Sequence, residues 1–166
     1  MREPLNDRTR LMHIVDAVDT ILGRTKNMTY EELINDKVQF GGIVYYTLVI
    51  GEAAYNLTKA FKKKYSELEW AQIEKMRHNL VHGYYNVDPE IVWSVIQDDL
   101  PALRRQVSLY LSEIDWDEWV QSNAVIKETA VHKVLIQNAE RMKKRGYDTD
   151  EICKITGLTR DEIDRL

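Results

Sequence analysis

The sequence predicts an all-α protein. Only seven glycines and three prolines occur in 166 residues, below the average usage of about 7% and 5%, so the chain has few of the turn residues that β-sandwiches and barrels need. Its apolar residues recur mostly at intervals of three and four, which is the spacing of one helix face. With 44% apolar and 30% charged residues, the composition fits a globular domain and excludes a disordered or collagen-like chain.

The first helix is predicted over residues 8–22, with Gly23 as its end. Its apolar face is formed by Leu11, Ile14, Val15, Val18, Ile21 and Leu22. Thr29 and Glu32 follow with the spacing of a capping box, in which each side chain accepts a hydrogen bond from the backbone N–H of the other residue. We therefore expect a second, short helix that runs to about Ile34.

The stretch 40–50, FGGIVYYTLVI, is compatible with two structures. Its β-branched and aromatic residues and its glycines are locally typical of a buried strand. Helical spacing continues, however, through the following GEAAYNLTKAFKKKY without a turn signal, and a lone strand would have no partner. These two observations favour a buried helix over residues 40–61.

The next helix is predicted to follow a second capping box at Ser66 and Glu69. Its core face is formed by Trp70, Ile73, Met76 and Leu80. Gly83 is expected to end this helix in a left-handed cap, because glycine adopts that backbone conformation without strain. The cap would leave His82 at a helix end, where its side chain meets solvent.

Asp88 and Pro89 predict the start of a further helix, as its N-cap and first-turn residue. That helix is expected to kink at Pro101 and to continue to about residue 115. Residues 1–115 are thus expected to form one antiparallel helical bundle, and residues 116–166 a C-terminal helical tail.

The tail is expected to contain a long helix, from about residue 120 to 145, and two short helices on either side of Gly157. The capping boxes of the short helices are Asp148 with Glu151 and Thr159 with Glu162. This outline matches a helix-turn-helix and also many plain helical tails. The last helix, TRDEIDRL, has three acids and two arginines, which disfavours a DNA-binding regulator.

Charge and cysteine content bear on partners and compartment. The net charge is −4, which argues against a general nucleic-acid coat and leaves room for a local basic site. Cys153 is the single cysteine, the N-terminal MREPLNDRTR lacks the apolar core of a signal peptide, and no apolar run approaches a membrane span. We expect a cytoplasmic protein without disulfides or membrane contact.

The chain has four histidines, so histidine chemistry has few candidate sites. An imidazole exchanges protons near neutral pH and a guanidinium suits phosphate oxygens. Arg77 and His82, five residues apart, combine the two groups. On one helix they would lie about 140° apart around the axis and about 7.5 Å apart along it, so they do not share a face. A second subunit across a two-fold axis could complete such a site.

Structural roles compete with this interpretation. His82 could instead cap helix carbonyls, with Arg77 paired to Glu74 or Glu52. His78 and His82 have the i, i+4 spacing of metal ligands on a helix, but no third His or Cys ligand lies nearby in the sequence, and we predict no metal site and no cofactor. The basic run is either a solvated face or an RNA-guiding surface; it consists of Lys59, Lys62, Lys63 and Lys64.

Two segments resemble a known family. They are IGEAAYNLTK at residues 50–59 and ELEWAQIEKMRHNLVHGYYNVDPEIVWSVIQDDLPALRRQV at residues 67–107. Their order and spacing resemble the HepT-like branch of the HEPN superfamily, with its Gly-Glu-Ala helix and its Arg-x4-His-x-Tyr core, over about residues 8–115. One departure is His78, at a position where these enzymes often have Asn.

The resemblance implies an antiparallel HEPN helical bundle, a homodimer with a shared cleft, and a metal-independent ribonuclease that is the toxin of a toxin–antitoxin pair. It implies that Arg77 and His82 occupy the catalytic positions, with His78 and Glu52 in supporting ones, and that RNA is the substrate. A non-catalytic HEPN module that binds RNA or a partner protein is the rival interpretation.

The resemblance also implies a partner that controls the activity. A minimal nucleotidyltransferase antitoxin would transfer AMP to Tyr84, the tyrosine of the Arg-x4-His-x-Tyr core. Because Tyr84 follows Gly83, its hydroxyl can project from a turn, and the added phosphate would repel RNA beside Arg77 and His82. The alternative is that Tyr84 packs in the core and Tyr85 is exposed.

Overall fold

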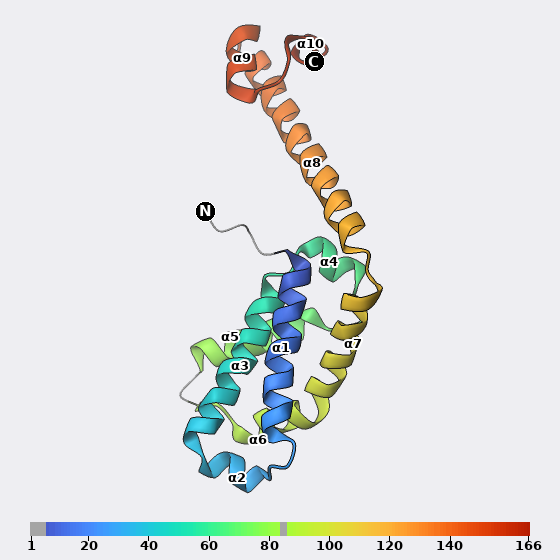
Figure 1. Cartoon of the computed structure of the whole chain (residues 1–166). Coiled ribbons are helices and arrows are strands. Elements are labelled where there is room, and N and C mark those ends of the chain that lie inside the picture. Colours follow the sequence, from blue (N-terminus) through green and yellow to red (C-terminus); the bar gives the residue numbers. More distant parts are fainter. Residues whose placement is uncertain (1–5, 84–85) are drawn as a thin grey trace. The chain divides into compact units, whose positions relative to one another are not determined.

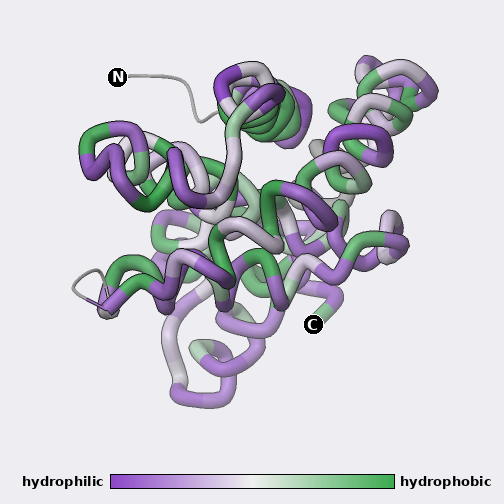
Figure 2. The backbone as a smooth tube through the Cα atoms, turned by 90° about the horizontal axis from the view of Figure 1, so that it is seen from below, coloured by the Kyte–Doolittle hydropathy of each residue, from purple (hydrophilic) through white to green (hydrophobic). Residues whose placement is uncertain are grey.

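The computed structural model describes the backbone of residues 6–83 and 86–166, and their side chains except those of 123–127. Every regular element in these residues is a helix, which confirms the predicted fold class (Figure 1). Contacts divide the chain into two compact units, Met1–Ile114 and Asp115–Leu166. Figure 2 shows how hydrophobic and hydrophilic stretches alternate along the helices.

The first unit is a bundle of helices. They are α1 (Asp7–Thr25), α2 (Tyr30–Asn35), α3 (Lys37–Tyr55), α4 (Lys59–Lys64), α5 (Trp70–His82), α6 (Pro89–Ser94) and α7 (Leu100–Glu113), with the π-helical turn η2 (Val95–Asp99) between the last two. The main packing contacts are made by α1, α3, α5 and α7: α3 packs against α1 and α5, and α1 also packs against α7. α1 and α3 run antiparallel and are joined through α2 (Figure 1). Their core includes Leu11, Ile14, Val18, Ile50, Ala54, Leu103 and Val107.

α1 extends beyond its predicted end at Gly23. The φ angle of Gly23 is not positive, and the helix continues to Thr25. Thr25 is buried, and its hydroxyl donates to the carbonyl of Ile21 at 2.9 Å. α1 thus accommodates Gly23, although glycine disfavours a helix interior by roughly 1 kcal/mol. α2 begins as predicted, because Thr29 and Glu32 form the capping box.

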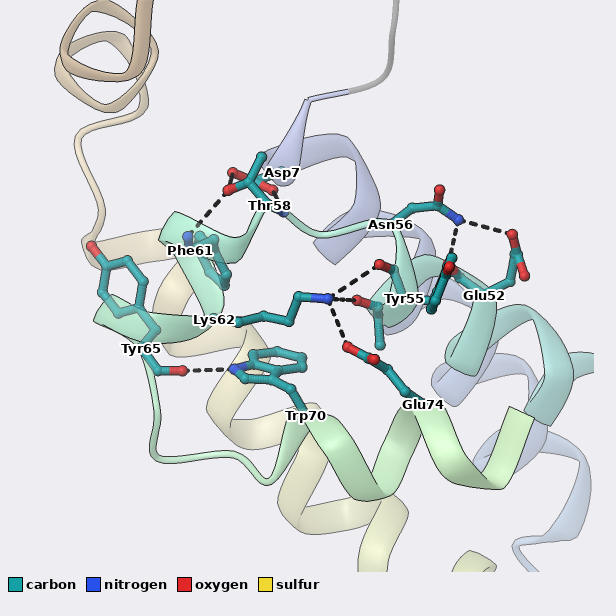
Figure 3. Close-up of polar contacts among 11 residues, drawn as sticks. Asp7, Glu52, Tyr55, Asn56, Thr58, Phe61, Lys62, Tyr65, Trp70 and Glu74 are labelled. Carbon is teal, nitrogen blue, oxygen red and sulfur yellow. Dashed lines mark hydrogen bonds and ion pairs between the residues drawn. The ribbon is translucent and has the colours of Figure 1, made fainter. Parts of the chain in front are cut away.

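The stretch 40–50 is helical and lies within α3. The helix does not continue into α4 as predicted, because Thr58 starts α4 by accepting the backbone N–H of Phe61 at 3.1 Å. Asp7 fixes this junction, since its carboxylate accepts from the N–H and the hydroxyl of Thr58 at 2.7 and 2.8 Å (Figure 3). A contact between residues 51 positions apart leaves no local signal in the sequence.

α5 starts without the predicted capping box at Ser66. The side chain of its N-cap, Glu69, accepts no backbone N–H of the helix; it accepts from the side-chain amide of Gln72. The indole N–H of Trp70 instead donates to the carbonyl of Tyr65 at 2.7 Å (Figure 3), which fixes the chain at this point. The predicted core face is buried at Trp70 and Leu80 and half-buried at Ile73 and Met76.

The predicted left-handed cap at Gly83 is wrong. Gly83 has φ −113° and ψ 19°, and its N–H donates to the carbonyl of Asn79 at 2.7 Å. This bond continues the α-helical pattern by one residue. Glycine is favoured here by space, because a Cβ atom would lie 2.8 Å from the same carbonyl oxygen.

Asp88 and Pro89 open the next helix as predicted, and Asp88 accepts a backbone N–H of the first turn at 2.9 Å. The interruption expected at Pro101 takes the form of η2, in which the N–H of Leu100 donates to the carbonyl of Val95, five residues earlier. Proline has no N–H, and its ring crowds the carbonyl four residues before it. The wider π-helical turn relieves this crowding.

The second unit consists of α8 (Trp116–Lys144), α9 (Thr149–Thr156) and α10 (Arg160–Asp164). α8 starts earlier than predicted, because Asp115 caps it by accepting the N–H groups of Asp117 and Glu118. None of the helices in the described part of the chain combines the length and the apolar character needed to cross a membrane.

The two short helices of this unit fold back through a glycine turn. Gly157 has φ +72° and follows α9, and Thr159 forms the predicted capping box with Glu162 at the start of α10. The small core of the unit consists of Ala139, Ile152, Leu158 and Ile163. The tail therefore has a long helix and two short helices around Gly157, an outline that helix-turn-helix domains share with plain helical tails.

Candidate active site

The side chain of Arg77 lies against α3. Its Nε donates to Oε2 of Glu52 at 2.8 Å, and its guanidinium carbon lies 5.2 Å from the centroid of the Tyr55 ring. Of the two carboxylates considered for Arg77 from the sequence, Glu52 is therefore the partner, and Glu74 pairs with Lys62.

This ion pair orients Arg77 more than it stabilises the fold. The side chains of Arg77 and Glu52 are 29% and 44% exposed, and such pairs contribute about 0.2–1 kcal/mol. Glu52 also accepts from the amide of Asn56 at 2.8 Å (Figure 3). Of the three guanidinium nitrogens of Arg77, only Nε makes a hydrogen bond to another described residue. Its two terminal amino groups are available to phosphate oxygens.

His82 is the last residue of α5, and its side chain is exposed, as predicted for a helix end. His78 lies one turn earlier and is also exposed. The centroids of the two imidazole rings are 4.5 Å apart, and the ring planes are inclined at 53°. The last turn of α5 therefore presents two adjacent imidazoles to solvent.

Both imidazoles line a groove of 1210 Å³ between α5 and the segment from α6 to α7. Its walls are largely apolar and include Ile73, Met76, Ile91, Val92, Val95 and Leu103. Arg77 does not line the groove. One copy of the chain therefore directs Arg77 and His82 to different sides of α5, as their spacing of five residues predicts.

The groove carries more negative than positive charge. Its described lining residues include one lysine, Lys75, and four carboxylates, those of Glu67, Glu69, Asp88 and Asp99. The hydroxyl of Tyr110 donates to Glu67 at 2.7 Å, and this hydrogen bond holds the pKa of Glu67 below its usual value. Binding of a phosphate group in the groove therefore requires a further cation. Arg77 of the same chain does not supply it, because it does not line the groove.

Of the lysines expected to guide RNA, Lys62 is engaged within the fold. Its Nζ lies 2.6 Å from Oε1 of Glu74 and donates to the carbonyls of Ala54 and Tyr55 at 3.2 and 3.1 Å (Figure 3). Lys62 thus satisfies the last carbonyls of α3. Lys59 and Lys63 are exposed on α4 and remain the candidates for contact with RNA.

Two further predictions concern this end of α5. Tyr84, the expected acceptor of AMP, and its neighbour Tyr85 lie outside the described residues. No cluster of three His, Cys, Asp or Glu side chains that could hold a metal ion occurs in the described residues. Tyr55 was not among the predicted site residues, although it follows Glu52 by three residues and therefore shares its face of α3.

Comparison with known proteins identifies a family and several relatives. The family model described as Ribonuclease HepT-like matches residues 14–109. A candidate RNase from Caldanaerobacter subterraneus subsp. tengcongensis is 34% identical over 106 residues, which are 64% of this chain and 95% of the relative. Another, from Methanocaldococcus jannaschii, is 32% identical over 105 residues, or 63% and 87% of the two chains.

A third relative, from Thermococcus cleftensis, is named probable ribonuclease HepT. It is 30% identical over 94 residues, which are 57% of this chain and 86% of the relative. No solved structure matches the chain significantly. The family match lies within the first unit and includes both Arg77 and His82.

Proposed function

Because the chain belongs to the ribonuclease HepT-like family, we propose that it is a metal-independent endoribonuclease, the toxin of a toxin–antitoxin pair, in which Arg77 and His82 carry out cleavage. The observation that carries this assignment is the exposed imidazole of His82, which ends α5 and lines the groove. Glu52 supports the site because it orients the guanidinium of Arg77.

His82 acts as general base and then as general acid. Its imidazole takes the proton of a ribose 2′-hydroxyl, whose oxygen attacks the neighbouring phosphorus. The bond from phosphorus to the 5′-oxygen breaks, that oxygen receives a proton from the imidazole, and a 2′,3′-cyclic phosphate remains. The terminal amino groups of Arg77 stabilise the negative charge that develops on the phosphoryl oxygens.

A homodimer is part of this proposal. In one copy Arg77 and His82 lie on different sides of α5, and the groove needs an additional cation for a phosphate group. Arg77 of a second copy would supply it across a two-fold axis. An exposed apolar face of α3 supports self-association: Val38 is 87% and Tyr45 is 61% exposed, and the space around Gly41 and Gly42 is open.

Cleavage of a defined RNA in the presence of EDTA tests the catalytic assignment. We expect the wild type to cut this RNA, to leave a cyclic phosphate, and to leave DNA of the same sequence intact. Arg77→Ala and His82→Ala should each lower the rate about 100-fold or more. His13→Ala, at an exposed histidine of α1, is the control and should keep the rate. Full activity in either site variant would remove that residue from the catalytic machinery. A wild type that cuts no RNA would favour a non-catalytic module that binds RNA or a partner protein.

Regulation by a nucleotidyltransferase antitoxin is the other part of the proposal. Tyr84 follows His82 by two residues, so an AMP group on its hydroxyl would bring a negative phosphate and a nucleoside close to the catalytic imidazole. The adduct would repel the RNA backbone. Mass spectrometry after coexpression with the antitoxin should find AMP on Tyr84. AMP on Tyr85 would move the site by one residue, and neutralisation without an adduct would mean inhibition by binding alone.

A further inference from the structure

The last turn of α5 has the form of a two-histidine chelate. His78 and His82 are four residues apart on one regular helix, their ring centroids are 4.5 Å apart, and both side chains are exposed. Two histidines at this spacing on a helix are a recurrent pair of metal ligands. Nitrogen ligands lie about 2.0–2.1 Å from a zinc ion, so neighbouring imidazoles can share one ion after a small change of side-chain torsion angles.

We propose that His78 and His82 together bind a divalent transition-metal ion that prefers imidazole, such as Zn²⁺, Ni²⁺ or Cu²⁺, and that this ion reversibly inhibits the ribonuclease. Imidazole suits these ions, and hard ions such as Mg²⁺ and Ca²⁺ prefer oxygen ligands. The proposal therefore assigns a regulatory ion to the site rather than a resident cofactor.

The surroundings of the two imidazoles favour a cation. The groove that both rings line carries the carboxylates of Glu67, Glu69, Asp88 and Asp99, against a single lysine among its described lining residues. A concave surface with such an excess of carboxylates has a negative potential that raises the local concentration of divalent cations. The same field does not attract the phosphate groups of RNA, so ion and substrate respond oppositely to it.

Two protein ligands explain why the ion would be exchangeable. No third His, Cys, Asp or Glu joins His78 and His82 in a metal-binding cluster among the described residues, so water would fill the remaining coordination positions. Structural zinc sites usually have four protein ligands and hold their ion firmly. A site with two ligands would fill and empty with the concentration of free metal ion.

Inhibition of RNA cleavage by the metal ion rests on the proposed function, in which His82 is the general base. A metal ion occupies the lone pair of an imidazole nitrogen, and the same lone pair must take the proton from the 2′-hydroxyl. Coordination therefore removes the general base without any change of fold. The binding of the ion, in contrast, does not depend on the role of His82 in catalysis.

Calorimetric titration with Zn²⁺ tests the binding. The full chain, first freed of metal with a chelator and then of the chelator by dialysis, should bind one ion, and His78→Asn and His82→Asn should each weaken binding about tenfold or more. His13→Asn, at an exposed histidine of α1, is the matched control and should bind like the wild type. Equal affinity of all four proteins would overturn the proposal.

An activity assay tests the inhibition. Zn²⁺ should lower the rate of RNA cleavage by the wild type and by His13→Asn, and EDTA should restore both rates. His78→Asn, compared with its own metal-free rate, should lose this sensitivity. Stimulation by Zn²⁺, or equal inhibition of His78→Asn, would overturn the proposal. A wild type that cuts no RNA even without metal would refute the proposed function, and the calorimetry would still decide whether the chelate exists.

Discussion

A side chain on Gly51 would collide with Arg77, because a Cβ atom built on Gly51 overlaps the Cβ of Arg77 and comes within 3.2 Å of its Cα. Gly51 is buried in α3, so the absence of a side chain allows α5 to pass close to α3 at the position of Arg77. The close approach brings the guanidinium next to Glu52 and Tyr55.

Gly51→Ala is therefore expected to displace α5. We expect the free energy of unfolding to fall by about 1–3 kcal/mol, the usual effect of overpacking, and RNA cleavage to fall with it. Gly23→Ala, within α1, is the control outside the proposed dimer face, because nothing lies within 4 Å of a Cβ atom there. It should stabilise the protein by about 0.5–1 kcal/mol, since alanine is the better helix former. Urea denaturation measures both changes, and equal stabilities would contradict the close approach.

Lys62 and Lys63 are neighbours on α4 with different expected roles. Lys62→Ala removes the hydrogen bonds to Glu74 and to two carbonyls of α3, and we expect it to lower the free energy of unfolding by about 1–2 kcal/mol. Lys63 is exposed, so Lys63→Ala should change stability by less than about 0.5 kcal/mol. Thermal or urea denaturation of the two variants checks this contrast, which a similar loss in both would exclude.

For RNA binding, the effect of Lys63→Ala should exceed that of Lys62→Ala. We expect Lys63→Ala to weaken binding of single-stranded RNA and to lower the slope of log affinity against log salt concentration by about 0.7, the value for one phosphate contact. Lys62→Ala should leave this slope unchanged, because its ammonium is already engaged. Fluorescence anisotropy at several salt concentrations gives both slopes. An unchanged slope in Lys63→Ala would remove Lys63 from the RNA surface.

Asp7 ties the start of α1 to the start of α4. Asp7 is 5% exposed, and its carboxylate accepts two hydrogen bonds from Thr58. Asp7→Ala removes the charged acceptor of two partly buried hydrogen bonds, and we expect a loss of about 1–3 kcal/mol in the free energy of unfolding. Asp16→Ala, at an exposed position of the same helix, should have little effect. Urea denaturation of both variants is the measurement, and a tolerated Asp7→Ala would show that Thr58 caps α4 without it.

The Tyr110–Glu67 hydrogen bond couples stability to acid pH. It lowers the pKa of Glu67 below the ordinary value of 4.5. A carboxylate with a lowered pKa in the folded state stabilises the fold above its unfolded-state pKa, and this contribution is lost as the pH falls through the folded-state pKa. The stability difference between the wild type and Tyr110→Phe should therefore be larger at neutral pH and shrink below pH 4.5. Urea denaturation across this range checks the trend, and a constant difference would argue against it.

Sequence signals predicted the elements where neighbouring residues determine them. Thr29 with Glu32 and Thr159 with Glu162 form their capping boxes, because both partners lie within one turn. The break at Thr58 depends instead on Asp7, which lies beside it in space but 51 positions earlier in the chain. The spacing of residues 40–61 could not reveal it.

The same distinction holds for the candidate site. The spacing of Arg77 and His82 was enough to predict that one helix directs them to different sides, and the groove confirms it. The engagement of Lys62 with Glu74 joins two helices, so the basic run looked uniform in sequence. The shape of the groove depends on how α6 and α7 pack beside α5, which no local pattern specifies.

Because of the π-helical turn η2, the lining of the groove depends on the number of residues in this helix as well as on their types. A π-helical turn holds about one residue more than an α-helical turn, so η2 is equivalent to a single inserted residue. Loss of one residue there would restore a regular α-helix and rotate α6 by about 100° relative to α7. Val92 would leave the core and a neighbour such as Ile91 would take its place. Single-residue insertions and deletions in this helix thus change which side chain of α6 is buried at the groove, a change that no one substitution can make.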